Sequence, residues 1–407
     1  MNLSYFISKR ISHEQKQGFS PAIHKIAVAS IGVGLAAVLI SFLVMLGFQE
    51  TVKDKVFSFS GHLVITKFTM NNSPEEQPMN YHIKIYDKQK EYPFIGHTQE
   101  YAHKPGLIKT ESEEVLGVVV KGVGKSYNVN AFQQNMVEGK FIEFPDSGYA
   151  NQIVISRIIS NKLKAAVGDD LVIHFFQNPP RFRKLTVTGI YETNLSEYFD
   201  SKVVIGDIRM IQRLNDWSDS LAGGIEVFVN DREHIDEAGF AIGETMDFDL
   251  NIERISDKFI QVFEWLHLLS RQVNILLGII LIVVCVNMIS IVLILVMERT
   301  QMIGMLKALG ANDGFIRSIF IFNGIHLIFK GLVLGNIIGL GLCLLQYRFR
   351  IIKLNPHDYY MSFVPIGWHW DIIILLNVLT FLVVTLVLLI PTMVIARINP
   401  IKTIRFD

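Results

Sequence analysis

The chain has 407 residues, of which 50% are hydrophobic and only 19% are charged, and its mean hydropathy is +0.35. This composition excludes an ordinary soluble protein and predicts membrane spans. The 38 Lys and Arg residues balance the 38 Asp and Glu residues, so the chain has no net charge with which to attract nucleic acid.

Four apolar runs are long enough to cross a bilayer as helices, which takes roughly 20 residues. They cover residues 26–48, 273–297, 319–346 and 372–396. The first run is much longer than the apolar part of a signal peptide, and no small-residue cleavage site follows it. We therefore interpret it as a retained transmembrane helix.

Lysine and arginine residues near the ends of these runs predict the orientation of the chain. They concentrate in residues 1–25, in the loop between the second and third runs, and in the tail after the fourth. With four spans these three segments share one side, which should be the cytoplasm, while the basic loop between the third and fourth runs is the exception. Both termini are predicted to be cytoplasmic, with an interfacial helix in the N-terminal tail.

Residues 49–269 have the character of a soluble α/β domain of about 220 residues, which is large enough for its own core. Strands are expected at residues 62–68, 81–86, 115–123, 152–156, 170–176, 183–191, 202–207 and 224–230, and helices at 156–167, 207–215 and 232–244. The predicted fold is an α-helical membrane protein with four transmembrane helices and a large α/β extracytoplasmic domain inserted between helices 1 and 2.

One expected hairpin of this domain contains Pro179 and Pro180 at its turn, flanked by Phe176 and Phe182. Proline cannot donate to a strand ladder, so the turn is stiff and unpaired. The aromatic side chains either pack into the domain core or make this a protruding hairpin that docks on a periplasmic partner.

The stretch from Met297 to Gly314 lies between two runs that cross the membrane. Its apolar residues Met302, Met305, Leu306 and Leu309 follow the i, i+3, i+4, i+7 spacing of one helix face. A helix at about residues 298–312, ending near a glycine, is therefore predicted at the membrane surface, where a soluble partner can reach it.

Motifs for catalysis are absent from the sequence. Residues 122–126, GVGKS, resemble the end of a phosphate loop, but Val119 stands where the first glycine should be. The chain is therefore predicted not to be an enzyme and to bind no cofactor or metal itself. Any ATPase that drives it must be another polypeptide.

The third apolar run has one face that lacks side chains, because glycine recurs every fourth residue. These glycines are Gly331, Gly335 and Gly339. Such a face lets helices approach closely in lipid. Lys330 lies beside it, and either extends to the membrane edge or faces the protein interior with Asn323 or Asn336 as a partner.

Residues 297–311, MERTQMIGMLKALGA, resemble the segment after the second span in permeases of the LolC/LolE, FtsX and MacB superfamily of type VII ABC transporters. The Pro, Ala-Arg, Pro pattern of residues 391–407 resembles the end of the same proteins. The segments FISKRI, GFQETVKDKVFSFSGHLVIT, VVVKGV and NPHDYYMSFVPI resemble LolC and LolE in particular. The resemblance implies a periplasmic domain at 49–269 and an FtsX-like permease domain at 270–407.

The resemblance also implies a mechanism and partners. A cytoplasmic LolD-like ATPase dimer would bind ATP and magnesium and drive a pair of permeases, made by a second copy or a paralogue. Its motion would pass mechanically to the periplasmic domains, and lipoproteins would be released from the inner membrane, among membrane lipids, to a LolA-like carrier. A MacB-like exporter with a separate ATPase is the alternative, and a membrane-anchored sensor that binds a ligand is the alternative from another class.

Residue roles follow from the resemblance by position. Contact with the ATPase would involve Glu298, Arg299, Ile303, Gly304, Lys307 and Gly310. The first two spans would line the cargo site, where Phe42, Met45 and Phe48 offer apolar surface for acyl chains. The hairpin at Pro179 and Pro180 is shorter than the carrier-binding hook of LolC, so the chain is either LolE-like or one half of a homodimer.

Overall fold

The computed structural model describes residues 20–70, 73, 75–109 and 115–393. The chain divides into two compact units. Unit 1 comprises Met1–Glu50, Trp265–Lys353 and Phe363–Asp407, and unit 2 comprises Thr51–Glu264 and Leu354–Ser362. The interfacial helix expected in residues 1–25 and most of the C-terminal family pattern lie outside the described residues.

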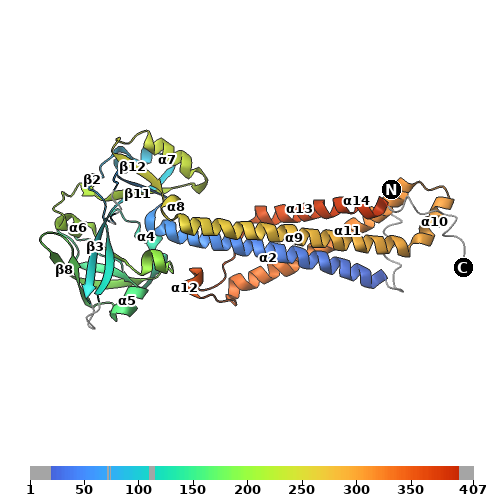
Figure 1. The fold of residues 1–407 in the computed structure, drawn as a ribbon, viewed down its shortest axis with the longest axis horizontal. Helices are drawn as coiled ribbons and strands as arrows, with labels where there is room; N and C mark the ends of the chain where they lie inside the picture. The colour runs from blue at the N-terminus through green and yellow to red at the C-terminus, as the bar shows by residue number, and fades with distance from the viewer. Residues whose placement is uncertain (1–19, 71–72, 74, 110–114, 394–407) are drawn as a thin grey trace. The chain divides into compact units, whose positions relative to one another are not determined.

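The described part of the chain contains four helices that are long and apolar enough to cross a membrane. They are α2 (Ser20–Ser60), α9 (Ile260–Glu298), α11 (Asp313–Phe349) and α13 (Trp370–Val387), which is followed by α14 (Leu389–Thr392) (Figure 1). The first three contain the apolar runs 26–48, 273–297 and 319–346, and α13 and α14 cover the run 372–396 as far as Thr392, since residues 394–396 lie outside the described part of the chain. A shorter helix, α10 (Thr300–Ala308), lies between α9 and α11 in the sequence.

Helices α2 and α9 are longer than the apolar runs that predicted them. Hydropathy detects only the apolar part of a helix, whereas α2 continues through polar residues to Ser60. Val52, Val56 and Phe59 recur at helical spacing in this extension and are buried. The extension of α2 therefore packs its apolar face inside unit 2, to which Thr51–Ser60 belong.

Unit 1 is held together by an apolar core and a few hydrogen bonds between helices. Asn287 of α9 donates to Ser30 of α2 at 2.9 Å, so these helices lie side by side (Figure 1). Asn336 of α11 and Asn377 of α13 exchange two hydrogen bonds, at 2.7 and 3.1 Å. Polar pairs of this kind stabilise helix association in lipid, where the alternative is an unsatisfied group.

Lys330 lies on the exposed side of α11. The interior alternative is therefore wrong, because Asn336 bonds to Asn377 and the side-chain oxygen of Asn323 has no partner. A long lysine side chain on an outward face can extend toward the membrane edge.

Unit 2 is built on a mixed ten-stranded sheet with the order β12-β1-β11-β3-β4-β9-β6-β8-β5, in which β7 pairs with β3 and β8. The strands are β1 (Leu63–Lys67), β3 (Ile95–Lys109), β4 (Val115–Val123), β5 (Met136–Gly139), β6 (Gln152–Ser156), β7 (Asp170–Phe175), β8 (Arg181–Tyr191), β9 (Val203–Asp207), β11 (Gly224–Val229) and β12 (Leu250–Arg254). A separate pair joins β2 (Met79–Asn80) to β10 (Leu221–Ala222). The pairs β4–β9 and β6–β8 are parallel, and the other pairs are antiparallel.

Short helices cover the sheet. They are α3 (Lys84–Asp87), α4 (Val129–Phe132), α5 (Arg157–Leu163), α6 (Ile208–Leu214), α7 (Ile235–Gly243) and α8 (Ile255–Lys258). The segment Leu354–Ser362, which contains α12 (Pro356–Tyr359), also belongs to unit 2. The Lys55 ammonium donates to the Tyr360 carbonyl at 2.7 Å and ties this segment to the end of α2.

One strand prediction is wrong, and one strand was not predicted, each for an identifiable reason. Residues 81–86 alternate like a strand, but Lys84–Asp87 form α3 and bury Ile85 in the core beside β11. Strand β3 was missed because it carries Pro105 and several polar residues. It is nevertheless central, and Pro105 sits opposite Val119 of β4 in the antiparallel ladder.

His62 immediately precedes β1 and is buried. The backbone N–H of Val229 donates to its Nδ1 at 2.9 Å, and its Nε2 has no partner. Burial and the nearby Arg232 guanidinium lower the pKa of His62 to about 4, against an opposing effect of Asp54. The ring is therefore neutral in the folded domain at neutral pH.

We expect unit 2 to lose stability as the pH falls from 6.5 to 4, because the unfolded chain takes up a proton at His62 that the folded domain resists. The loss should reach up to about 3 kcal/mol. In His62→Asn, whose side-chain oxygen can accept from Val229, the pH dependence should flatten. Hydrogen exchange of β1 and β11 amides across this pH range measures the effect, and equal slopes in the two proteins would contradict it.

Candidate functional site

Helix α10 presents two faces of different character. Ile303 is fully buried and packs, with the half-buried Met302 and Leu306, into the core of unit 1. Met305 and Leu309 are 60% and 82% exposed. The predicted apolar stripe is therefore divided: one part anchors the helix, and the other is open to a partner.

The end of α10 is fixed by its own sequence. Gly310 has φ +92, a left-handed conformation that glycine adopts without strain. Asn312 then caps α11 by accepting from the Phe315 N–H at 2.7 Å. The Lys307 ammonium lies 2.9 Å from the Asp313 carboxylate, so it braces the turn between α10 and α11.

The six residues assigned to the ATPase contact do not share one face. Ile303 and Gly304 are buried against this chain, so they position α10 within unit 1, and their part in an ATPase contact stays a prediction. Glu298 and Gly310 are exposed, and Arg299 and Lys307 are half-buried. Met305 and Leu309, which were left out, are exposed instead.

The glycine face of α11 lies against α2. A Cβ added to Gly331 would lie 2.7 Å from Ile31, one on Gly335 would lie 2.8 Å from the Gly32 carbonyl oxygen, and one on Gly339 would lie 3.1 Å from the Ala36 Cα. No side chain larger than hydrogen fits these positions without movement of the backbone. The close approach of the two helices therefore depends on these glycines.

The three candidate cargo residues of α2 differ in exposure. Phe48 is only 8% exposed and meets Trp265 of α9 edge-on, with ring centroids 5.3 Å apart. Its ring packs against α9 and exposes little apolar surface, so its contact with acyl chains stays a prediction. Phe42 and Met45 are half-buried, and Phe42 packs against the core of unit 1.

The hairpin of β7 and β8 combines the two alternatives that the sequence left open. Phe175 is buried in the domain core, whereas Phe176 and Phe182 are 67% and 63% exposed. Pro179, which follows a cis peptide bond, and Pro180 form the exposed turn. The hairpin thus places two aromatic rings and a stiff turn on the surface.

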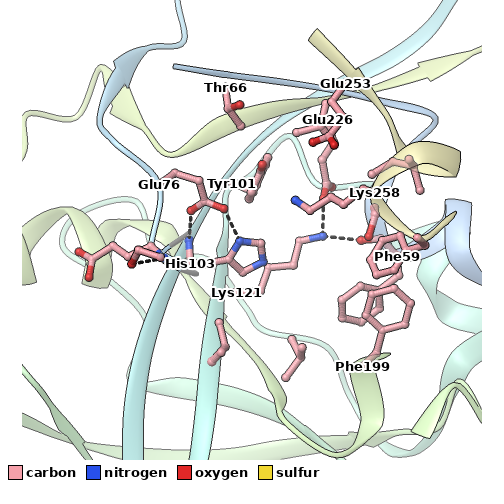
Figure 2. A pocket seen from close by; sticks show the side chains of 18 of the residues that line it. Phe59, Thr66, Glu76, Tyr101, His103, Lys121, Phe199, Glu226, Glu253 and Lys258 are labelled. Atoms are coloured by element: carbon pink, nitrogen blue, oxygen red, sulfur yellow. Dashed lines mark hydrogen bonds and ion pairs between the residues drawn. The ribbon is translucent and has the colours of Figure 1, made fainter. Parts of the chain in front are cut away.

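A buried lysine connects the end of α2 to the sheet of unit 2 (Figure 2). The Lys121 ammonium on β4 donates to the Phe59 carbonyl oxygen and to Glu226 Oε1 of β11, the latter at 2.6 Å. The side chains of Lys121 and Glu226 are only 1% and 3% exposed. Burial lowers the pKa of Lys121, and the Glu226 carboxylate opposes that shift.

A second, half-buried pair joins His103 of the neighbouring strand β3 to Glu76, which precedes β2. His103 approaches Glu76 twice, with its Nδ1 2.6 Å from Oε1 and its backbone N–H donating to Oε2 at 3.0 Å. Burial opposes ionisation of Glu76, but these contacts with His103 lower its pKa. Figure 2 shows both pairs facing one cavity, together with Tyr101.

Tyr101 is buried to 1% exposure, and its hydroxyl has no hydrogen-bond partner among the described residues. Burial raises the pKa of Tyr101 well above its usual value, and the carboxylates of Glu76, Glu226 and Glu253 raise it further. The phenol is therefore a neutral, buried donor without a hydrogen-bond partner among the described residues.

The GVGKS segment has no room for a phosphate. A Cβ on Gly124 would collide with the Glu100 side chain, whose carboxylate accepts from Ser126. Lys125 points away and lies 3.0 Å from the exposed Asp146. The segment is a turn after β4.

Comparison with known families decides the identity of the chain. Residues 26–245, which are 220 of the 407 residues, match the MacB-like periplasmic core domain, and residues 274–400 match the FtsX-like permease C-terminal family. The chain belongs to the FtsX/MacB-like superfamily of ABC transporter permeases. As its apolar helices require, this permease is a membrane protein.

Individual relatives extend over almost the whole permease. The lipoprotein-releasing system transmembrane protein LolE of Haemophilus influenzae is 23% identical, over 95% of this chain and 94% of that protein. LolC of Xylella fastidiosa is 20% identical, over 100% of this chain and 98% of that protein. The extracellular domain of the transporter YknZ covers 47% of this chain and 99% of its own, at 12% identity and a TM-score of 0.33, which supports no structural argument.

Residues that the sequence analysis did not single out form the polar centre of the large domain. Lys121 and Glu226 lie in correctly predicted strands, where a charged residue inside an otherwise apolar strand was a signal that a buried partner exists. The sequence could not say that the partners were each other and the carbonyl of Phe59. Tyr101 and His103 lie on β3, which was not predicted at all.

Alanine substitutions at different glycines of α11 should differ in their effect on the stability of the permease. Gly335→Ala should destabilise it by about 1 to 3 kcal/mol, because the new methyl group meets the Gly32 backbone. Gly341→Ala on the same helix is the control, because a Cβ there has nothing within 4 Å. Thermal unfolding of the full chain in detergent measures both, and equal midpoints would refute close packing at Gly335.

The buried pair predicts strong coupling in a double-mutant cycle. Lys121→Met removes the cation that pairs with the buried Glu226 carboxylate, which then keeps only the Gln99 amide as a donor, and should cost roughly 3 to 5 kcal/mol. Adding Glu226→Gln should recover part of that loss. Hydrogen exchange of β4 and β11 amides gives the free energies. Lys125→Met, at an exposed pair, is the control and should cost at most about 1 kcal/mol; additive losses at Lys121 and Glu226 would contradict the pairing.

Proposed function

We propose that this permease is the membrane subunit of an ATP-driven complex that releases lipoproteins from the inner membrane. The observation that carries the proposal is the near full-length similarity to proteins named LolC and LolE of lipoprotein-releasing systems. The match includes both the large domain and the permease region. No relative of this kind supports the sensor alternative.

The ATPase is a separate LolD-like dimer that binds ATP and magnesium in the cytoplasm, where both termini of the permease also lie. We propose that it docks on the outward face of α10, where Met305 and Leu309 offer apolar anchors beside Glu298. Buried apolar side chains supply most of the affinity at such interfaces, and rim charges mainly set register. Ile303, packed in the core, makes α10 move with the membrane helices.

The motion then passes to the periplasmic domain through α2, whose end bonds to the sheet at Lys121. A second permease copy or a paralogue completes the pair. The hairpin with Phe176, Pro179, Pro180 and Phe182 is the candidate docking element for a LolA-like carrier. Phe42 and Met45 remain the candidate contacts for acyl chains.

Purification of the permease from its native membrane in mild detergent, followed by mass spectrometry, tests the proposal. We expect a small ATPase and acylated lipoproteins to co-purify. An ATPase without lipoproteins would instead support a MacB-like exporter with another cargo, and the absence of any ATPase would overturn the transporter assignment.

A charged substitution on the exposed face of α10 should weaken the binding of the ATPase to the permease. Met305→Glu places a charge where an apolar contact is expected, and should reduce the amount of co-purified ATPase by at least roughly tenfold. Met70→Glu makes the same change at an exposed methionine of the large domain and should leave the ATPase bound. Equal retention in both variants would show that α10 does not carry the contact.

A further inference from the structure

A cavity of about 540 Å³ lies over one face of the sheet in unit 2. Its floor follows alternate residues of neighbouring strands, such as Thr66 on β1, Tyr101 on β3 and Glu253 on β12. The lining extends from β12 to the start of β9, which is five strand spacings in the sheet order. At roughly 4.8 Å per spacing the groove is on the order of 24 Å long.

The middle of this groove combines apolar walls with one unsatisfied polar group. Phe59, Phe199 and Phe259 contribute aromatic surface. The Tyr101 hydroxyl is buried, faces the cavity in Figure 2, and has no partner among the described residues. An unpaired buried hydroxyl is costly, so the site is complete only when a hydrogen-bonding group enters it.

At each end of the groove lies one charged side chain that is not paired with another described residue, and the two differ in sign. Within the groove, Lys121 pairs with Glu226, and His103 with Glu76. The side chain of Glu253 at the β12 end forms no hydrogen bond or ion pair with another described residue, and the same holds for the side chain of Lys202 at the β9 end. Lys258 adds a second cation to the lining.

We propose that this groove binds an extended polypeptide segment, with a basic residue at Glu253 and an acidic residue at Lys202. The Tyr101 hydroxyl donates to a backbone carbonyl of that segment between the two charges. The aromatic walls pack against its intervening apolar side chains.

The dimensions and charges favour a polypeptide over a single small ligand. An extended chain rises about 3.3 Å per residue, so roughly seven residues span the groove. A simple anion would satisfy only Lys202 and Lys258, and a simple cation only Glu253. A segment with both signs satisfies each end and offers carbonyl groups in between, as required for the buried phenol.

Binding is tested on the full permease in detergent, without ATPase or lipoprotein, so a failure here would leave the proposed function standing. The probe is a fluorescent heptapeptide, blocked at both ends, with lysine at one end, glutamate at the other, and threonine and valine between. We expect saturable binding. The same peptide with glutamine at both ends should bind at least roughly tenfold more weakly, because two charge-assisted contacts are lost.

Three variants locate the contacts. Glu253→Gln should weaken the lysine–glutamate peptide by roughly tenfold, whereas Glu237→Gln, an equally exposed glutamate of α7 outside the groove, should have no effect. Tyr101→Phe should weaken binding while leaving thermal stability unchanged or higher, because the hydroxyl it removes has no partner in the free protein. Glu253→Lys should reverse the preference toward a peptide with glutamate at both ends.

Equal binding of the charged and neutral peptides, or an unchanged preference in Glu253→Lys, would overturn the proposal. Displacement of the peptide by phosphoethanolamine at equal concentration would also overturn it, because the groove would then recognise a lipid headgroup. Tight binding to Tyr101→Phe would remove the central hydrogen bond from the account.

Discussion

The Lys121 ammonium is removed from water, so its acceptors must come from the protein. It finds them in the Glu226 carboxylate of β11 and in the carbonyl of Phe59, one of the last residues of α2. Carbonyls at a helix C-terminus lack intrahelical donors and attract cations. If the end of α2 shifted away from the sheet, the buried ammonium would lose one of its two acceptors and keep only Glu226. The helix end and the sheet are therefore expected to move together.

Helix α10 is likewise fixed to the protein by a buried side chain on one face, while its other face is exposed. Ile303 is packed into the core of unit 1, while Met305 and Leu309 remain exposed. A helix fixed on one side and open on the other can transfer a push from a partner to the helices that it contacts. Within unit 1, the glycine-mediated packing of α11 on α2 is a second close contact on which the proposed mechanism can rely.

Periodicity and hydropathy were enough to locate the apolar helices and most strands, including β4 at its full extent, residues 115–123. They failed where tertiary context decides. The end of α2 is polar by composition yet helical, and β3 carries Pro105 and buried polar residues that disguise a central strand. The candidate site was even harder to predict from the sequence. Phe59, Tyr101 and Glu226 are distant in sequence, and only the folded sheet brings them together.

The central claim is that motion reaches the periplasmic domain through the contact between α2 and Lys121. The most direct test is the number of lipoproteins released per ATP hydrolysed by a reconstituted complex that carries Lys121→Gln. The account predicts that ATP hydrolysis continues while release per ATP falls well below that of the unmodified complex. An unchanged ratio in a folded variant would contradict the claim, because the helix end would then be dispensable for transmission.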